Sequence, residues 1–274
     1  MGVTATDIHL AVRAVRLSGQ VLCVHASLRS FGWVVGGART VVDALLAEGC
    51  TVLVPTFSSV AYEVWPDPPD RIEGNGLGPH PPAGGPPGAR CPYSPAAEDV
   101  DPHMGAVAAA VLATPGRVRG DHPVNSFSAV GPAAHELVAG QRPQHVYAPL
   151  ETLAATGGAV LLMGVGLERM TLLHLAEQRA GRAPFIRWAN GSDGRIMRVH
   201  AGGCSEGFSN LSRALAGVTT HVPIGLSQWA VLPAAAALEA AVAALRADPA
   251  ITHCSDRACE RCNDAVRGGP RGSA

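Results

Sequence analysis

The sequence of 274 residues predicts an α/β protein with a mixed central sheet and flanking helices. Three observations support this fold class. A strand, a helix and a second strand follow one another within residues 20–55, as in a parallel pair joined by a crossover helix. The apolar run 158–163 predicts another buried strand. Two strand-like segments, 185–188 and 195–200, flank the turn sequence 190–194, so we expect an antiparallel hairpin in the second half.

Each element follows from a local pattern. Apolar residues three and four apart predict amphipathic helices, short apolar runs predict buried strands, and a proline favours the start of the last long helix. In chain order we expect a helix at 7–18, a strand at 20–25, a helix at 38–48, a strand at 49–55, helices at 103–112 and 132–138, a strand at 158–163, a helix from 171, the hairpin 185–200 and an Ala-rich helix at 233–247.

Residues 65–96 interrupt this pattern, because ten of these 32 residues are proline and six are glycine. Such a composition does not form regular helix or sheet, so we expect a long loop within a single domain of residues 1–266. Residues 267–274 are expected to form a flexible tail. Acidic residues in and just after the loop are usually only solvated, but they would also suit a polycationic ligand. They are Asp67, Asp70, Glu73, Glu98, Asp99 and Asp101.

Composition excludes several classes of protein. The net charge of −1 gives no basic surface for nucleic acid, and no apolar run is long enough to cross a membrane. All 21 basic residues are arginines, so the chain has no Schiff-base lysine and no nucleotide-binding lysine. Residues 1–9 do not show the charged-then-apolar pattern of a secretion signal, and the seven cysteines do not suggest a disulfide framework. A cytoplasmic protein is therefore expected.

The segment 171–177, with the sequence TLLHLAE, is the first candidate for chemistry. It follows the apolar run 158–163 and a glycine-containing turn, and Thr171 can cap the helix that begins there. His174 and Glu177 are three residues apart and therefore share a helix face. A histidine and a carboxylate in this position have the make-up of a general base and its companion. A core histidine satisfied by a nearby acid is the alternative.

Two further segments are candidates for a binding site. Residues 24–32 place hydroxyl groups and Arg29 in a turn after a buried strand, where N–H donors can bind an anion. An ordinary strand-to-helix turn has the same make-up. Residues 119–128 interleave polar and apolar side chains, as in the lining of a pocket. His122 in this segment precedes a proline and could equally be an exposed loop residue.

Cysteines mark two more segments. In residues 202–208, glycines near Cys204 allow close approach of a ligand, and Cys204 could act as a nucleophile with His174 as its base. The second group contains one histidine and three cysteines within ten residues and could hold zinc. Its members are His253, Cys254, Cys259 and Cys262. Adjacent residues are awkward as joint ligands, so reduced thiols without a metal are the alternative.

Read together and in order, these segments resemble the aminoglycoside 3-N-acetyltransferase family, whose members are antibiotic N-acetyltransferases unrelated in fold to the GNAT acetyltransferases. Two sequences carry the resemblance most specifically: His-Pro-x-x-Ser-Phe at 122–127 and Thr-x-x-His-x-x-Glu at 171–177. The other matching pieces are 24–32, 44–46, 51–57, 103–107, 115–134, 148–150, 160–166 and 204–208.

The resemblance implies transfer of an acetyl group from acetyl-CoA to the 3-amino group of the 2-deoxystreptamine ring of an aminoglycoside, and with it antibiotic resistance. It implies that His174 is the general base, that Glu206 or Glu177 orients it, and that Thr171 helps to stabilise the oxyanion. The implied cofactor-binding residues are Ser27, Leu28, Arg29, Ser30, Gly32, Asn125, Ser126, Phe127 and Ser128, and the implied substrate-binding residues are Glu177, His122 and Asp99. This chemistry requires no metal, and a monomer or a homodimer is expected.

The chain departs from the family pattern at Gly120–Asp121, where Arg-Ser is usual, and at Ala148, where serine is common. The acceptor therefore stays open, and an N-acyltransferase of natural-product biosynthesis acting on another amine is an alternative. A metal-dependent hydrolase using His174 and Glu177 is a weaker one, because these residues supply too few ligands. The last alternative is a zinc-stabilised module without activity, centred on 253–262.

Overall fold

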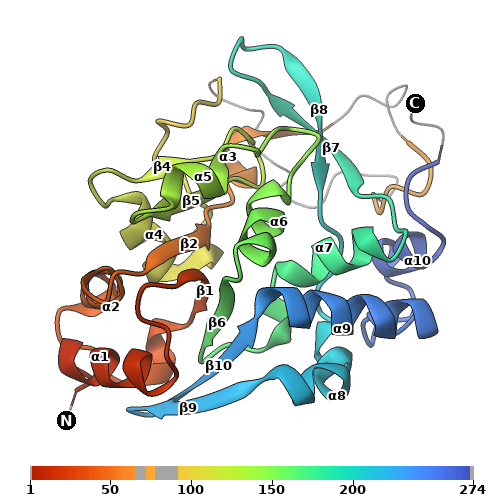
Figure 1. The fold of residues 1–274 in the computed structure, drawn as a ribbon. Coiled ribbons are helices and arrows are strands. Elements are labelled where there is room, and N and C mark those ends of the chain that lie inside the picture. Colours follow the sequence, from red (N-terminus) through yellow and green to blue (C-terminus); the bar gives the residue numbers. More distant parts are fainter. Residues whose placement is uncertain (1, 66–71, 78–91, 272–274) are drawn as a thin grey trace.

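A computed structural model describes residues 2–65, 72–77 and 92–271, and Figure 1 shows a central twisted sheet with helices packed around it. The seven strands of this sheet lie in the order β4–β5–β2–β1–β6–β10–β9. Their bounds are β1 (Val21–Ala26), β2 (Thr51–Pro55), β4 (Val118–Arg119), β5 (Phe127–Val130), β6 (Ala159–Met163), β9 (Thr220–Ile224) and β10 (Ser227–Pro233).

The centre of the sheet is parallel and its sides are antiparallel. β1 pairs in parallel with β2 and β6, so that Leu22 lies between Val52 and Ala159. β5 on one side and β10 on the other run antiparallel to their neighbours. The predicted mixed sheet with a parallel pair is therefore confirmed. The hairpin of β9 and β10 was not predicted; Pro223 interrupts its pattern, and proline is tolerated there because β9 is an edge strand.

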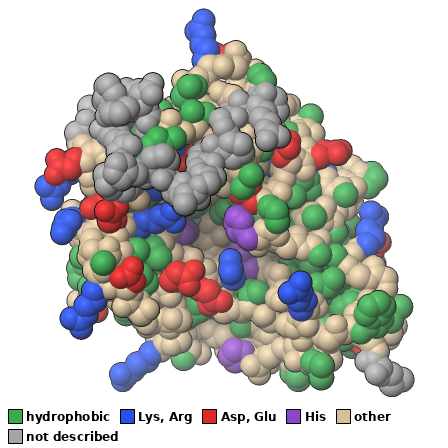
Figure 2. Space-filling model, turned by 180° about the vertical axis from the view of Figure 1, so that it is seen from behind, with side chains coloured by type: hydrophobic (Ala, Val, Ile, Leu, Met, Phe, Trp, Pro, Cys, Tyr) green, Lys and Arg blue, Asp and Glu red, His purple; other side chains and the backbone are tan. Residues whose placement is uncertain are grey.

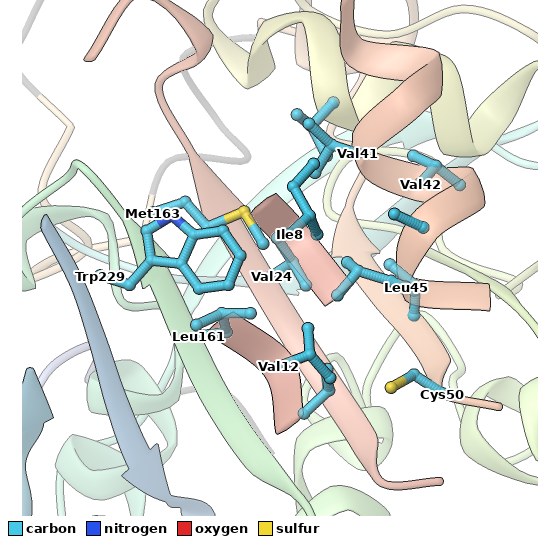
Figure 3. Packing of buried hydrophobic residues seen from close by; sticks show 14 of the residues in the cluster. Ile8, Val12, Val24, Val41, Val42, Leu45, Cys50, Leu161, Met163 and Trp229 are labelled. Carbon is cyan, nitrogen blue, oxygen red and sulfur yellow. The ribbon is translucent and has the colours of Figure 1, made fainter. Parts of the chain in front are cut away.

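Successive residues of the central strands point to opposite faces, and each face has its own apolar layer. Leu22 and Val24 of β1 belong to the layer under the first helices, whereas Cys23 belongs to the layer on the other face. Figure 3 shows the first layer, where Val24 and Trp229 pack among helix side chains. A strand with both faces covered is apolar along its whole length, which is why the runs in the sequence identified it.

Helices cover both layers. The first layer lies under α1 (Ala5–Ala14), α2 (Gly37–Ala47) and α4 (Gly105–Leu112). The second lies under α5 (Ala134–Val138), α6 (Ala148–Ala155), α7 (Leu172–Arg179), α8 (Ser212–Leu215) and α9 (Ala234–Ala247). The shorter α3 (Ser59–Tyr62) and α10 (Glu260–Val266) lie outside these layers.

The first helix begins and ends earlier than the predicted range 7–18. Thr4 caps its start, because the Thr4 hydroxyl and the Asp7 carboxylate each accept a hydrogen bond from the backbone N–H of the other residue. Arg16 adopts a left-handed backbone conformation with a φ of 57°, which follows the end of the helix. The apolar spacing alone did not reveal either signal.

A second, three-stranded sheet stands beside the first and contains β3 (Glu63–Val64), β7 (Phe185–Asn190) and β8 (Ile196–Ala201). The predicted hairpin is confirmed as β7 and β8, in which Trp188 lies opposite Arg198. It belongs to this separate sheet and not to the central one. Part of the Pro- and Gly-rich segment packs against it: Asn75 donates to the Ile186 carbonyl at 2.8 Å and accepts from the Ile186 N–H at 2.7 Å.

The remainder of the predicted loop, 66–71 and 78–91, lies outside the described residues. The predicted tail 267–274 is described as far as Arg271, and its backbone is hydrogen-bonded to the rest of the chain. Ala183 N–H donates to the Gly268 carbonyl at 2.9 Å, and Arg271 N–H donates to the Glu73 carbonyl at 3.0 Å. None of the helices in the described part of the chain is long and apolar enough to cross a membrane.

Candidate active site

A cavity of about 1370 Å³ opens at the carboxyl ends of the parallel strands β1, β2 and β6. In open α/β sheets this edge is the usual place for ligand binding, because the loops that leave the strands surround it. Among the residues that the structure describes, three histidines line the cavity: His25, His103 and His174. Figure 2 shows one face of the molecule with a central hollow that has histidine side chains at its edge.

His174 and Glu177 form a hydrogen-bonded pair in the cavity wall. The turn after β6 leads into α7, whose first turns carry both residues on one side. His174 Nδ1 lies 2.9 Å from Glu177 Oε2, and the two side chains are 12% and 11% exposed. This contact occupies one ring nitrogen and leaves Nε2 for a proton from a bound molecule. The arrangement is that of an acid that orients a histidine base.

The far side of Glu177 is held by two residues that the sequence did not single out. Arg182 Nη1 forms an ion pair with Glu177 Oε1, and the Thr252 hydroxyl donates to the same oxygen at 3.0 Å. Arg182 also donates to Thr252 Oγ1 at 2.8 Å. Both carboxylate oxygens are therefore engaged, which fixes the direction of the Glu177 side chain toward His174.

Aromatic rings hold the His174 imidazole from two sides. The Tyr147 ring lies parallel to it at 6.2 Å, and the Phe208 ring lies edge-on at 4.7 Å. Gly202 completes this frame, because a Cβ on it would lie 2.8 Å from the His174 ring and 2.7 Å from the Tyr147 hydroxyl. The glycines near Cys204 were expected to allow close approach of a ligand, whereas Gly202 approaches the side chains of His174 and Tyr147. Tyr147 carried no signal in the sequence beyond its place beside the family sequence Ala148-Pro-Leu.

Thr171 lines the cavity and is 7% exposed, but its side chain does not cap α7. Thr171 itself has helical backbone angles, so its hydroxyl is not placed to accept from the first N–H groups. The predicted cap is therefore wrong.

Of the two carboxylates expected to orient the base, the structure places Glu177 and not Glu206 against His174. Glu206 is exposed and does not line the cavity, and the carboxylate on His174 Nδ1 is that of Glu177. The loop that carries Glu206 approaches the imidazole through Gly202 and Phe208 instead.

Only part of the segment 27–32 faces the cavity. Ser27, Leu28 and Arg29 line it, and Arg29 is exposed. Ser30 instead bonds within the protein, because its hydroxyl donates to the Ser27 carbonyl at 2.7 Å and lies 2.8 Å from the Ser227 hydroxyl. Gly32, with a φ of 79°, follows the short helix Leu28–Phe31 and does not line the cavity. The structure therefore gives no support to the predicted cofactor contacts of Ser30 and Gly32.

Within the segment 125–128, too, only some of the residues face the cavity. Asn125 lines the cavity, and its Oδ1 is buried with no hydrogen-bond partner among the described residues. Ser126, Phe127 and Ser128 are fully buried and do not line the cavity. They enter β5, an internal strand, where the Ser128 hydroxyl lies 2.8 Å from that of Thr56. The structure therefore gives no support to the prediction that Ser126, Phe127 and Ser128 contact the cofactor.

His122, an expected substrate contact, is instead engaged by backbone groups of the protein itself. It is fully buried, does not line the cavity, and its Nε2 lies 2.9 Å from the His200 carbonyl. Its Nδ1 accepts from the backbone N–H groups of Val124 at 3.2 Å and Asn125 at 2.9 Å. This pattern requires a neutral imidazole, and burial lowers the pKa of His122 to about 4.

Asp99 also lies away from the cavity, since it is exposed and accepts from the Tyr62 hydroxyl at 2.7 Å. Other acidic residues line the cavity: Glu63, Asp101 and Glu168. Asp101 accepts from the N–H groups of Ser59 and Val60, each at 3.0 Å, so its oxygens are already engaged.

The remaining acidic residues of the predicted group do not contribute to the described cavity wall. Glu73 and Glu98 are exposed and lie outside the lining, and Asp67 and Asp70 lie outside the described residues. Burial raises the pKa of Glu63, with the Arg187 guanidinium 3.7 Å away opposing that shift.

Cys204 does not line the large cavity, so the geometry does not support its role as a nucleophile. Its sulfur lies instead beside three sulfurs from the C-terminal segment. The Sγ atoms of Cys204, Cys254, Cys259 and Cys262 all lie within 4.8 Å of one another, and this is the group of candidate metal ligands found among the described residues. The histidine of the predicted zinc set, His253, is not a member of this group.

Comparisons with known proteins agree with these features. The family model described as aminoglycoside 3-N-acetyltransferase matches residues 23–246. Aminoglycoside N(3)-acetyltransferase VIII of Streptomyces fradiae is 39% identical over 180 residues, which are 62% of this chain and 58% of that protein. The match thus spans about three fifths of the length of such curated relatives.

Solved structures share the fold over almost the whole chain. The apoenzyme of aminoglycoside acetyltransferase AAC(3)-IVa superposes with a TM-score of 0.78 at 23% identity, covering 98% of each chain. The complex of AAC-IIIb with CoASH gives a TM-score of 0.70 at 25% identity and covers 90% of this chain and 97% of that one. Since the family model matches most of the sequence, the chain belongs to the aminoglycoside 3-N-acetyltransferase family.

Proposed function

We propose that this protein transfers an acetyl group from acetyl-CoA to an amino group of an aminoglycoside, at the 3-position of the 2-deoxystreptamine ring, and thereby confers resistance. The observation that carries the proposal is the His174–Glu177 pair, held at 2.9 Å in the wall of a large cavity of a protein of this family. The family relatives are named for N(3)-acetylation of aminoglycosides, which supplies the acceptor class. Because acetyl-CoA is a cytoplasmic metabolite, the reaction would occur in the cytoplasm.

His174 acts as the general base in the proposed reaction. The acceptor nitrogen attacks the thioester carbon, a C–N bond forms, and His174 Nε2 takes the proton that the nitrogen loses. The C–S bond then breaks, and the proton passes to the departing CoA sulfur. Glu177 stabilises the imidazolium between these two transfers, and its second oxygen is held by Arg182 and Thr252. The Thr171 hydroxyl, in the cavity wall, is the proposed donor to the oxyanion.

The acetyl-CoA site is proposed along the turn after β1 and the loop before β5. Ser27 and Leu28 line the cavity with backbone groups at the end of a parallel strand, and Asn125 Oδ1 is a buried acceptor without a partner among the described residues. A buried orphan acceptor costs stability unless a ligand donates to it, and the pantetheine arm of CoA carries amide N–H groups. Arg29 and Arg169 are exposed on the cavity lining and are the proposed phosphate contacts, since the chain has no lysine.

The acceptor site is proposed beside Glu63 and Glu168, two carboxylates of the cavity wall. An aminoglycoside carries several ammonium groups, and carboxylates in a partly enclosed site attract such a ligand strongly. A solved family relative at 24% identity was crystallised with a gentamicin, which indicates the kind of molecule to test first.

The decisive assay is release of the free CoA thiol with acetyl-CoA and a panel of acceptors: 2-deoxystreptamine aminoglycosides, aminoglycosides without that ring, and simple amines. We expect turnover with the first group and acetylation of its 3-amino group in the isolated product. In His174→Ala we expect kcat to fall by about a hundredfold or more, the usual scale for a general base. An exposed histidine, His221, provides the matched control His221→Ala, which should keep full activity.

Turnover confined to simple amines would replace the aminoglycoside by another acceptor and favour a biosynthetic acyltransferase. Full activity of the His174→Ala variant would overturn the mechanism. A hydrolase using His174 would require a metal bound by this histidine, whereas the candidate metal ligands found among the described residues are the four cysteines.

A further inference from the structure

We propose that Cys204, Cys254, Cys259 and Cys262 bind one structural zinc ion, which fastens the C-terminal helix to the loop that supports the catalytic histidine. The site is separate from the acetyl-transfer reaction proposed above. The four sulfurs come from two segments about fifty residues apart in sequence, and they meet within 4.8 Å of one another.

The spacing of the sulfurs fits a tetrahedral ion. With Zn–S bonds of about 2.3 Å, the sulfurs of a tetrahedral site lie about 3.8 Å apart. Four Sγ atoms within 4.8 Å of one another need only a small contraction to reach that distance. The four cysteines are free thiols, so no disulfide competes for these sulfurs.

Local backbone geometry supports the same site. Cys259 and Cys262 are three residues apart at the start of α10, the Cys-x-x-Cys spacing found in zinc sites. The N–H of Cys254 points to the Cys262 sulfur at 3.4 Å. N–H donors to sulfur stabilise thiolates, and thiolates are the form that binds zinc.

His253 is excluded as a ligand by its own hydrogen bonds. Its Nδ1 lies 2.8 Å from the Cys254 carbonyl, and its Nε2 lies 3.2 Å from Asn263 Oδ1. Both ring nitrogens face oxygen acceptors, which leaves none for a metal. The fourth ligand is therefore Cys204, which lies too far away in the sequence for a spacing rule to find it.

The site would act as a clamp behind the catalytic pair. Cys204 follows Gly202, which lies against the His174 ring, and precedes Phe208, which packs on the same ring. Thr252, which precedes the ligand Cys254 by two residues in the sequence, donates a hydrogen bond from its hydroxyl to the Glu177 carboxylate. One ion would thus fix both the loop over the imidazole and the segment of chain behind its carboxylate.

Sulfur ligands decide the kind of metal. Four thiolates exclude the hard cations Mg²⁺ and Ca²⁺, which prefer oxygen, and a closed tetrahedral set without an open position is typical of structural zinc. Binding would release the protons of the thiols and leave a site that takes no part in acyl transfer.

The test is made on the full-length protein, purified without chelators and without a metal-affinity column. Elemental analysis should find about one zinc per chain. Replacement by Co²⁺ should give the intense sulfur-to-cobalt charge-transfer band and the visible bands of tetrahedral cobalt. Removal of the metal with a chelator should lower Tm by about 5 °C or more, and added Zn²⁺ should restore it.

Variants distinguish the proposed set of four cysteine ligands from the set predicted from the sequence, in which His253 takes the place of Cys204. Cys204→Ser should lose zinc or release it much faster to a chromogenic chelator, whereas His253→Asn and the core variant Cys50→Ser should each retain about one zinc. The cobalt spectrum of the wild-type chain decides the question if Cys204→Ser does not fold.

Several results would overturn the proposal. They are a chain free of zinc that also fails to take up added Zn²⁺, iron bound in its place, disulfides among these cysteines in protein kept under reducing conditions, or loss of zinc in His253→Asn with retention in Cys204→Ser.

Discussion

Two histidine-bearing segments that are equally prominent in the sequence have opposite environments in the structure. His122 is sealed in the interior, with both ring nitrogens used by backbone groups. His174 stands in the cavity wall, with one nitrogen on a carboxylate and the other left for a ligand. A histidine can therefore act as a base only where its neighbours leave one of its ring nitrogens without a hydrogen-bond partner. A family sequence motif around a histidine does not show whether that histidine stabilises the fold or takes part in the reaction.

The largest effect that we expect from the burial of histidines is a loss of stability at low pH. Burial lowers the pKa of His122, and likewise of His25, to about 4, while an unfolded histidine titrates near 6.5. The unfolded state therefore binds more protons, and the stabilisation present above pH 6.5 is lost as the pH falls toward 4. At 1.36 kcal/mol per pH unit, the loss is roughly 3 kcal/mol for each histidine. Urea unfolding at a series of pH values should show it, and a flat profile between pH 7 and 5 would contradict it.

The variant His122→Phe should remove the contribution of His122 to the stability of the fold without directly altering the catalytic pair. It keeps the ring volume but leaves two backbone N–H groups and the His200 carbonyl without partners, which should cost about 3 kcal/mol in the free energy of unfolding. It should also remove the His122 share of the acid transition. The exposed counterpart His221→Phe should change stability by less than about 0.5 kcal/mol. Loss of activity without any loss of stability in His122→Phe would assign the residue to the reaction after all.

The variant Glu177→Gln should weaken the catalytic role of His174. The amide has the same size, but it cannot stabilise the imidazolium, so we expect kcat to fall about tenfold to a hundredfold. KM for acetyl-CoA should stay within about twofold, because Glu177 is placed behind the base and away from the proposed CoA contacts. Steady-state kinetics with thiol release measure both. An unchanged kcat would remove Glu177 from the mechanism.

The smallest effect is expected for Glu206→Gln, the matched control for the preceding variant. Glu206 is exposed and outside the cavity lining, so kcat, KM and Tm should all stay close to wild type. A loss of kcat as large as that of Glu177→Gln would restore Glu206 as the carboxylate that orients the base.

Much of the fold was predictable because it rests on periodicity. The central strands are apolar throughout since both faces are covered, and the runs at 20–25, 49–55 and 158–163 show this directly. The hairpin of β9 and β10 was missed because an edge strand with Pro223 is only half buried and lacks such a run. The helix α10 was missed because its seven residues form no apolar stripe.

The sequence by itself determined that His174 and Glu177 share a helix face, because residues three apart on a helix are neighbours whatever surrounds them, but it left open whether Glu177 or Glu206 orients the base. Only the tertiary structure decided the rest of the site. It placed Arg182 and Thr252 behind the carboxylate, turned His122 inward, and brought Cys204 to three cysteines some fifty residues later. The physical reason is that helix geometry fixes contacts at short and constant offsets, whereas contacts between distant segments depend on how whole elements pack.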